Sequence, residues 1–389
     1  MPPKISVVMP CLNEKETLAT CIRKARNSLA RMSYDSEIIV ADNGSTDGSV
    51  EIATSLGARV VIEEERGYGN AYRAGISAAL GDYIIIGDSD DSYDFNDIER
   101  FVGPLADGAD FVIGSRLKGR IEKGAMPWLH RYVGNPVLTW ILNFMYRSGI
   151  SDAHCGMRAF TRAAYQKMNL QTTGMEFASE MVIKSARLGL RTVEIPITLH
   201  PDGRSRPPHL RSFRDGWRHL RFMLVHSPTH LYLWPGTIIF IIGFVLLFAL
   251  LPGPIKIAGV LFDLHIMVLG SLMAILGFQL INMGVYARIY AVTHNFRPED
   301  SNMKKAFKLF NLERGLVAGV LVFLLGFSTD LYILIKWIAN DFGPLNEIRM
   351  ALFGSTFIII GTQIIFSSFF LSMLGIKVRP QDVRVNELD

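Results

Sequence analysis

The chain has 389 residues, 49% of them apolar, a net charge of +4 and three cysteines. So small a charge gives no indication of nucleic-acid binding. Cys11, Cys21 and Cys155 lack the spacing of a disulfide framework or a zinc site, so we expect reduced thiols in a cytosolic compartment. Long uncharged stretches follow about Ser227, which predicts a soluble domain and then segments that lie in lipid.

The first part of the chain alternates short apolar runs with helical patterns. It reaches the run Ile5–Pro10 without a signal peptide, so we do not expect this domain to be exported. The alternation predicts an α/β domain with a doubly wound, mainly parallel sheet and a site at the carboxyl ends of its strands. The expected strands cover 5–10, 37–41, 59–62, 83–86, 110–114 and 193–197, and the expected helices cover 18–29, 49–56, 69–80 and a stretch from 97.

The fourth of these strands ends in an acidic segment, Asp88-Ser89-Asp90-Asp91, and we expect no basic residue to neutralise it. Asp88 and Asp90 share one face of an extended chain. Paired carboxylates at the end of a strand suit a divalent cation that holds a diphosphate. The alternative is an acidic turn that caps the next helix.

Two further polar turns lie at the expected sheet edge. Asp42 ends the second strand, where a carboxylate can accept hydrogen bonds from a base or a ribose hydroxyl. Gly67-Tyr68-Gly69 precedes the third helix, but this pattern alone is a weak indication of a phosphate loop.

Three motifs in this order resemble those of the family-two glycosyltransferases, which have a GT-A fold: Pro10-Cys11-Leu12-Asn13-Glu14, the stretch 41–48, and Asp88-Ser89-Asp90-Asp91. The stretches 108–116 and 151–160 look like the polyprenyl-phosphate branch and are similar to dolichyl-phosphate mannose synthases. The match covers about the first 220 residues. The resemblance implies an enzyme that transfers one sugar from a UDP- or GDP-linked donor to undecaprenyl or dolichyl phosphate.

The resemblance also implies roles for individual residues. Asp88 and Asp90 would hold Mg²⁺ or Mn²⁺ on the diphosphate, and the nucleotide would be surrounded by Pro10, Asn13, Glu14 and Asp42. In the mannose synthases the position two beyond the second aspartate is often Gln, whereas here it is Ser92, so a third metal contact is in question. Processive synthases of the same superfamily carry a Gln-x-x-Arg-Trp motif, and its absence here favours transfer of a single sugar.

A lipid phosphate as acceptor changes what the enzyme must supply. Its second pKa is about 6, so it needs positioning and counter-charges more than a base. The candidates are Arg116, Arg131 and Arg158, each with an ordinary ion pair as the alternative. Asp91 is a candidate for orienting the acceptor or acting as a base, and direct displacement would invert the anomeric configuration.

Two later segments border the expected site. Glu176 and Glu180 lie four apart on an expected helix, so they share a face that lines a sugar pocket or is solvated. Arg204 lies in a loop with Pro and Gly after the last strand, where a mobile lid over the donor is expected.

An amphipathic helix precedes the membrane segments. Arginines follow its apolar positions by one residue, which suits the plane of an anionic leaflet; the apolar positions are Leu210, Phe213, Trp217, Leu220 and Leu224, and the arginines are Arg211, Arg214, Arg218 and Arg221. The segment 128–146 is a second such candidate, and core packing is the alternative for both.

Four stretches are long and apolar enough to span a bilayer: 231–251, 264–287, 315–335 and 351–376. The positive-inside rule places the basic loop between the second and third in the cytoplasm, together with both termini; its basic residues are Arg288, Arg297, Lys304, Lys305, Lys308 and Arg314. Asp330 is the acidic residue within a span, and we assign it no role.

We therefore expect a cytosolic catalytic domain at 1–208, an amphipathic interface helix at 209–228, a transmembrane domain at 229–376 and a cytosolic tail at 377–389. The expected partners are a nucleotide sugar, a polyprenyl phosphate and the membrane, and a homo-oligomer is left open. Two alternatives are a transporter of the sugar-lipid with a soluble loading module and a catalytically silent binding module.

Overall fold

The structure, a computed structural model, describes residues 4–205, 212–293 and 312–374. It divides into two compact units, 1–223 and 224–389. The expected interface helix is α8 (Ser212–Val225), most of which belongs to the first unit. Several predictions fall outside the described residues: those for Leu210, Arg211, Arg297, Lys304, Lys305, Lys308 and the tail at 377–389.

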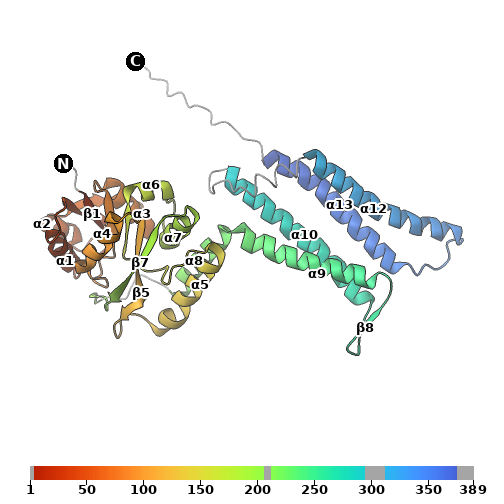
Figure 1. Ribbon diagram of the computed structural model, residues 1–389, viewed down its shortest axis with the longest axis horizontal. Helices are drawn as coiled ribbons and strands as arrows, with labels where there is room; N and C mark the ends of the chain where they lie inside the picture. Colours follow the sequence, from red (N-terminus) through yellow and green to blue (C-terminus); the bar gives the residue numbers. More distant parts are fainter. Residues whose placement is uncertain (1–3, 206–211, 294–311, 375–389) are drawn as a thin grey trace, which may run out of the picture. The chain divides into compact units, whose positions relative to one another are not determined.

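The first unit is built on a seven-stranded sheet with the order β3-β2-β1-β4-β6-β5-β7 (Figure 1). Only β6 runs antiparallel to its neighbours, β4 and β5, so the prediction of a mainly parallel sheet is confirmed. The strands are β1 (Ile5–Cys11), β2 (Ser36–Asp42), β3 (Arg59–Ile62), β4 (Tyr83–Ile86), β5 (Phe111–Ile121), β6 (Arg158–Thr161) and β7 (Thr192–Leu199).

The order 3-2-1-4 in the first half of the sheet is that of a doubly wound fold, in which connections turn to opposite sides of β1. The crevice between the ends of β1 and β4 is the switch point, where such sheets bind ligands. The motifs that follow β1, β2 and β4 therefore meet at one edge.

Helices cover the sheet because their apolar residues recur at spacings of three and four. In α1 these are Leu18, Cys21, Ile22 and Ala25, all fully buried. The other helices are α2 (Ser49–Ser55), α3 (Tyr68–Ala78), α4 (Ile98–Ala106), α5 (Asn135–Tyr146), α6 (Arg162–Met168) and α7 (Phe177–Arg187), with short turns η1 (Phe95–Asp97) and η2 (His130–Gly134). The three cysteines are buried and free.

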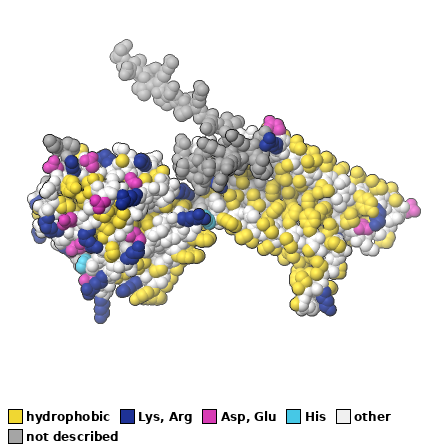
Figure 2. Space-filling view, in the orientation of Figure 1, with side chains coloured by type: hydrophobic (Ala, Val, Ile, Leu, Met, Phe, Trp, Pro, Cys, Tyr) yellow, Lys and Arg dark blue, Asp and Glu magenta, His cyan; other side chains and the backbone are white. Residues whose placement is uncertain are grey.

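The second unit has four helices long and apolar enough to cross a membrane, as predicted: Thr229–Leu250, Leu264–Thr293, Leu312–Ala339 and Ile348–Leu374. The first comprises η3 (Thr229–Leu233) and α9 (Trp234–Leu250), and the others are α10, α12 and α13. Figure 2 shows hydrophobic side chains over most of their visible surface. The protein is an integral membrane protein. A hairpin of β8 (Ile255–Ile257) and β9 (Val260–Phe262) joins α9 to α10 and was not predicted.

Glycines let these helices pack closely in pairs. A Cβ on Gly243 of α9 would lie 2.3 Å from the backbone nitrogen of Ala274 in α10, and one on Gly361 of α13 would lie 2.4 Å from that of Phe323 in α12. Small residues at such crossings are how helices associate in lipid, where apolar burial offers no driving force. A hydrogen bond of 2.6 Å between the hydroxyls of Ser271 and Thr356 joins α10 to α13.

Candidate functional site

The loops after β1, β2 and β4 are tied together by hydrogen bonds. The Ser89 hydroxyl donates to the carbonyl oxygen of Pro10. Asn13 has a left-handed backbone with φ of 59°, and its Oδ1 accepts from the backbone N–H of Thr46 at 2.8 Å. The structure thus brings Pro10 and Asn13 to the same edge of the sheet as the acidic segment after β4.

Asp42 lies at the end of β2, and one of its two carboxylate oxygens accepts hydrogen bonds from the protein. Its Oδ2 accepts from the backbone N–H groups of Gly44 and Ser45, both at 3.0 Å. Its Oδ1 is buried and has no hydrogen-bond partner among the described residues. A buried acceptor without a partner costs free energy, so this oxygen is suited to a ligand that donates a hydrogen bond.

Asp88 is held by two tyrosines of α3. Its Oδ1 accepts from the hydroxyls of Tyr68 at 2.9 Å and Tyr72 at 3.2 Å. Its Oδ2 faces Gly156, where a Cβ would lie 2.5 Å away. Burial, and then the negative charge of Asp90, raise the pKa of Asp88 to about 6. Two carboxylates that repel each other in a half-buried crevice fit a divalent cation, which prefers such hard oxygen ligands.

Arg204 supplies positive charge to the carboxylates at this edge of the sheet. Its guanidinium donates to Asp90 Oδ2 at 2.8 Å, to Glu14 Oε1 at 3.2 Å and to Asp202 Oδ2 at 2.9 Å. The other oxygen of Asp90 accepts from the hydroxyl of Ser92 at 2.6 Å. Ser92, the departure from the mannose-synthase pattern, therefore orients Asp90.

Asp91 does not join this group. It has a left-handed φ of 62° and forms an ion pair of 2.8 Å with Lys24 of α1. The expectation that no basic residue neutralises the acidic segment is therefore wrong, because Lys24 and Arg204 come from distant parts of the chain. Because Lys24 occupies this carboxylate, the geometry does not favour a proton-accepting role for Asp91.

The three candidate arginines do not converge on the acidic segment. Arg116, 9% exposed, holds Asp152 through two hydrogen bonds of 2.7 Å. Arg158, 1% exposed, donates to the carbonyl oxygens of Cys155, Ala178 and Ala153. Both guanidinium groups are committed to the protein, because a buried charge must be satisfied internally. Arg131 lies over the ring of Tyr132 in η2.

Helices α3 and α7 form one wall of the site. The backbone N–H groups of Gly69 and Asn70 donate to the carbonyl oxygen of Thr173 at 2.9 and 3.2 Å. A Cβ on Gly69 would lie 2.4 Å from the carbonyl oxygen of Thr172. The Gly-x-Gly pattern therefore serves close packing and does not form a phosphate loop.

The two glutamates of this wall differ. Glu180 is buried, and it accepts from the backbone N–H groups of Gln171 and Thr172 and pairs with Lys184 at 2.7 Å. It fixes the loop before α7, so the solvated face expected as an alternative is wrong for Glu180. Glu176 is the N-cap residue of α7, and its Oε2 is buried without a partner among the described residues.

Sequence reasoning missed the residues that surround Asp88. Tyr68 and Tyr72 lie four apart on one helix, and that spacing was the available signal. Gly156 lies inside the stretch 151–160, but nothing in its neighbours' identity indicates contact with Asp88. Tyr93, whose hydroxyl accepts from the backbone N–H of Gly156 at 2.8 Å, carries no pattern at all.

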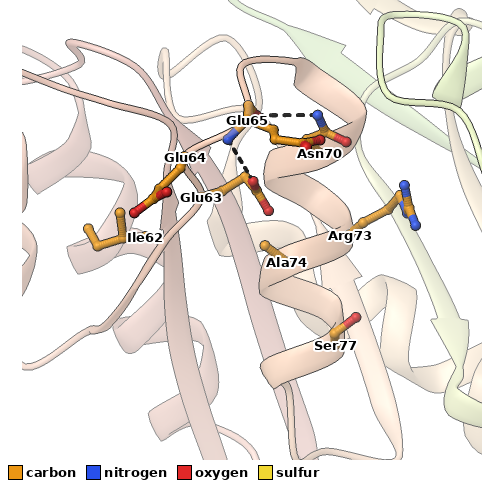
Figure 3. Close-up of a pocket in the computed structure, with 8 residues that line it drawn as sticks. All are labelled: Ile62, Glu63, Glu64, Glu65, Asn70, Arg73, Ala74 and Ser77. Carbon is orange, nitrogen blue, oxygen red and sulfur yellow. Dashed lines mark hydrogen bonds between the residues drawn. The ribbon is translucent and has the colours of Figure 1, made fainter.

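A surface hollow of about 610 Å³ lies apart from these residues, between the loop after β3 and α3. Figure 3 shows Glu63, Glu65 and Asn70 on one side and Arg73 farther along the helix. None of the predicted site residues lines it, and we assign it no function.

Two family models match the chain. Residues 6–168 match "Glycosyl transferase family 2", and residues 285–375 match "Glycosyltransferase family 2 C-terminal transmembrane region". Together they cover parts of both compact units.

Named relatives agree with these matches. The chain is 40% identical over 375 residues to the low-salt glycan biosynthesis hexosyltransferase Agl6 of Haloferax volcanii, covering 96% of this chain and 89% of that one. It is 31% identical over 196 residues to a dolichyl-phosphate hexose transferase of the same organism, covering 50% of this chain and 81% of that one. A solved glucosyl-3-phosphoglycerate synthase of Mycobacterium tuberculosis, bound to Mn²⁺, UDP and glucosyl-3-phosphoglycerate, is 24% identical with a TM-score of 0.45, covering 57% and 78%. The chain belongs to glycosyltransferase family 2 and is a membrane-embedded glycosyltransferase.

Proposed function

We propose that the enzyme transfers a single hexose from a UDP- or GDP-linked donor to a polyprenyl phosphate, undecaprenyl or dolichyl, with inversion and with a divalent cation. The observation that carries this proposal is that Asp42, Asp88 and Asp90 lie at or just beyond the carboxyl ends of β2 and β4, on one edge of the sheet, in a chain that also has four apolar helices. The hexosyltransferase and dolichyl-phosphate hexose transferase relatives support the choice of sugar class and acceptor.

We assign the donor to the edge formed by β1, β2 and β4. Asp88 and Asp90 would hold Mg²⁺ or Mn²⁺, which supplies positive charge to the leaving nucleoside diphosphate. Asp42 presents one buried carboxylate oxygen to the base or ribose, and Asn13 and Glu14 lie beside it. Arg204, which pairs with Asp90 and Glu14, would turn to the diphosphate when the donor binds.

A phosphate acceptor is compatible with the ion pair between Asp91 and Lys24. A sugar hydroxyl needs a base, whereas a phosphomonoester with a pKa of about 6 is largely ionised at neutral pH. The pairing of Asp91 with Lys24 is therefore no obstacle to transfer onto a lipid phosphate. In this proposal Arg116 and Arg158 are positioning residues that hold the loop at 151–158, and Arg131 belongs to the membrane-facing surface.

Exposed aromatic side chains on the first unit support contact with the bilayer. The exposed fractions are 70% for Trp128, just before η2, 66% for Tyr132 on η2 and 65% for Trp140 on α5. On α8, Phe213 and Trp217 are exposed while Asp215, His219 and Met223 are buried, so the core-packing alternative is wrong for these two aromatics. Figure 2 shows hydrophobic side chains gathered at the edge of the first unit that carries α5. Amphipathic surfaces of this kind bind the headgroup region.

We propose that the catalytic unit faces the cytosol. The basis is the concentration of Lys and Arg between residues 288 and 314, which the positive-inside rule assigns to the cytoplasmic side. Nucleotide sugars are then taken from the cytosolic pool.

The test uses the full-length protein in vesicles that contain polyprenyl phosphate, with a panel of labelled UDP- and GDP-hexoses, with and without EDTA. We expect label from one donor to enter the lipid phase as a monosaccharide, and EDTA to abolish the transfer. Label in a water-soluble polymer, or no transfer to any polyprenyl phosphate, contradicts the proposal.

A further inference from the structure

Besides Asp42 Oδ1 and Arg204 Nε, three further buried polar atoms of the first unit, on two residues, have no hydrogen-bond partner among the described residues. They are both ring nitrogens of His154 and Oε2 of Glu176. Each residue as a whole is half-buried, so neither belongs to the fully buried core. Buried polar groups are nearly always paired in a working protein, and a ligand is one source of the missing partners.

One route of contacts leads from Asp88 to Glu176. The hydroxyl of Tyr72 donates to Asp88. Its ring stacks on Phe177, with 5.7 Å between the ring centroids and 9° between the planes. Phe177 follows Glu176 directly, so the N-terminus of α7 stands beside the tyrosines that hold the candidate metal ligand.

A second route leads back from α7 to Asp88 through His154. The hydroxyl of Ser179 is 2.8 Å from His219 Nδ1, and the His219 ring meets the His154 ring edge to face at 4.7 Å. His154 is two residues before Gly156, which packs against Asp88. Burial lowers the pKa of His219, and the charge of Glu176 opposes this shift, so His154 and Glu176 both lie near His219.

The chemistry of this pair selects against a charged ligand. The carboxylate of Glu176 repels a phosphate. Burial, followed by the charges of His219, Arg116 and Arg158, lowers the pKa of His154 well below its usual value, so its ring is neutral at pH 7. Among the residues that the structure describes, no three His, Cys, Asp or Glu side chains form a metal site. A carboxylate acceptor and a neutral imidazole, which donates with one nitrogen and accepts with the other, suit a neutral polyol.

The loop that presents Glu176 is fixed in advance. Thr173 is held by the N-terminus of α3, and Thr172 is held by Glu180 at 2.9 Å through its backbone N–H. At Gly174 a Cβ would lie 2.6 Å from Glu176 Oε2, so a side chain there would displace the carboxylate. A rigid loop keeps a recognition group in place without an entropic cost on binding.

We propose that Glu176 and His154 bind hydroxyl groups of the transferred hexose and determine which nucleotide sugar the enzyme accepts. The inference rests on the proposed function in one respect, that the donor carries a hexose. It does not depend on the identity of the acceptor.

The experiment measures binding to the full-length protein in nanodiscs with Mn²⁺ and without acceptor. Calorimetry gives the affinity for each nucleotide sugar of the panel and for its nucleoside diphosphate alone. In Glu176→Gln we expect the affinity for the preferred nucleotide sugar to fall by about tenfold to a hundredfold, as for a lost hydrogen bond to a charged group, while the affinity for the nucleoside diphosphate stays unchanged. His154→Gln is expected to show the same split, and Glu176→Asp to restore part of the loss.

Glu99→Gln is the matched control, because Glu99 lies in the first turn of α4 and is exposed; it should change neither affinity. The inference is overturned if Glu176→Gln and His154→Gln keep the wild-type affinity ratio, or if they lose nucleoside diphosphate binding to the same extent. If the ratio falls as expected but the wild type transfers no sugar to a lipid phosphate, the proposed acceptor fails and this inference stands.

Discussion

Arg204 donates a hydrogen bond of 2.8 Å to Asp90, the second of the two candidate metal ligands. The same guanidinium contacts Glu14 at 3.2 Å. The positive charge at this position therefore comes from the loop after β7, in which Arg204 lies 114 residues beyond Asp90.

Because Arg204 pairs with Asp90, it competes with the cation for this carboxylate. In our proposal the same guanidinium contacts the diphosphate when the donor binds. In Arg204→Gln we expect Mn²⁺ to bind more tightly when donor is absent, because Asp90 loses its ion pair. We also expect kcat/KM for the nucleotide sugar to fall by about tenfold to a hundredfold, since a charge-assisted contact to the diphosphate is lost. Mn²⁺ titration and steady-state kinetics measure the two effects, with Arg100→Gln, which removes an exposed ion pair with Asp97, as control. Weaker Mn²⁺ binding in Arg204→Gln would count against this account.

The raised pKa of Asp88 predicts how stability depends on pH. The folded protein binds this proton more tightly than the unfolded chain, whose carboxyl titrates near about 3.9. The stabilising contribution is therefore complete below about pH 4 and is lost as the pH rises through about 6, the pKa of Asp88. In EDTA, the melting temperature of Asp88→Asn minus that of the wild type should grow over this interval. A difference that is constant from pH 4 to pH 7 would show that the Asp88 pKa is not raised.

Variants of Arg116 and Asp152 can distinguish a positioning role of Arg116 from a catalytic role. Both side chains are buried, so Asp152→Ala should leave an uncompensated charge and cost about 3–5 kcal/mol of stability. The double variant Arg116→Met with Asp152→Leu should recover part of this loss in thermal unfolding. If the double variant is stable but its kcat falls to background while donor binding is normal, Arg116 acts on the substrates and our assignment of it as a positioning residue is wrong.

The contact between α3 and the loop before α7 predicts a sharp difference between two glycines. Gly69→Ala places a methyl group against the Thr172 carbonyl oxygen, 2.4 Å away, and should cost about 1–3 kcal/mol as an overpacked contact. Because α3 carries Tyr68 and Tyr72, Mn²⁺ affinity should fall as well. Gly216→Ala in α8, where nothing lies within 4 Å, should stabilise the protein by about 0.5–1 kcal/mol. Equal melting temperatures for the two variants would contradict the packing described here.

Much of this architecture could be predicted because it depends on local periodicity. The runs at 5–10, 37–41 and 83–86 are buried strands because short, mostly apolar runs suit the centre of a parallel sheet. Strand β6 was missed because its four residues, from Arg158 to Thr161, show neither an apolar run nor alternation. It forms through pairing with β4 and β5, which is a tertiary effect.

The candidate site could likewise be predicted only in part. Asp42, Asp88 and Asp90 could be predicted because each stands at or just beyond the end of a strand, where chain order alone fixes the edge. The partners of the arginines could not, since Arg116 with Asp152 and Arg204 with Asp90 are separated by 36 and 114 residues. No local pattern distinguishes an arginine that holds a loop from one that meets a phosphate.

The most direct test of the account is sugar transfer to polyprenyl phosphate by the wild type and by Asp90→Asn, in the same vesicles and with the preferred donor. We predict that the wild type forms a lipid-linked monosaccharide, that EDTA stops it, and that Asp90→Asn lowers kcat/KM by about a hundredfold or more while its fold is retained. Wild-type rates in Asp90→Asn, or transfer that is insensitive to EDTA, would contradict the central claim.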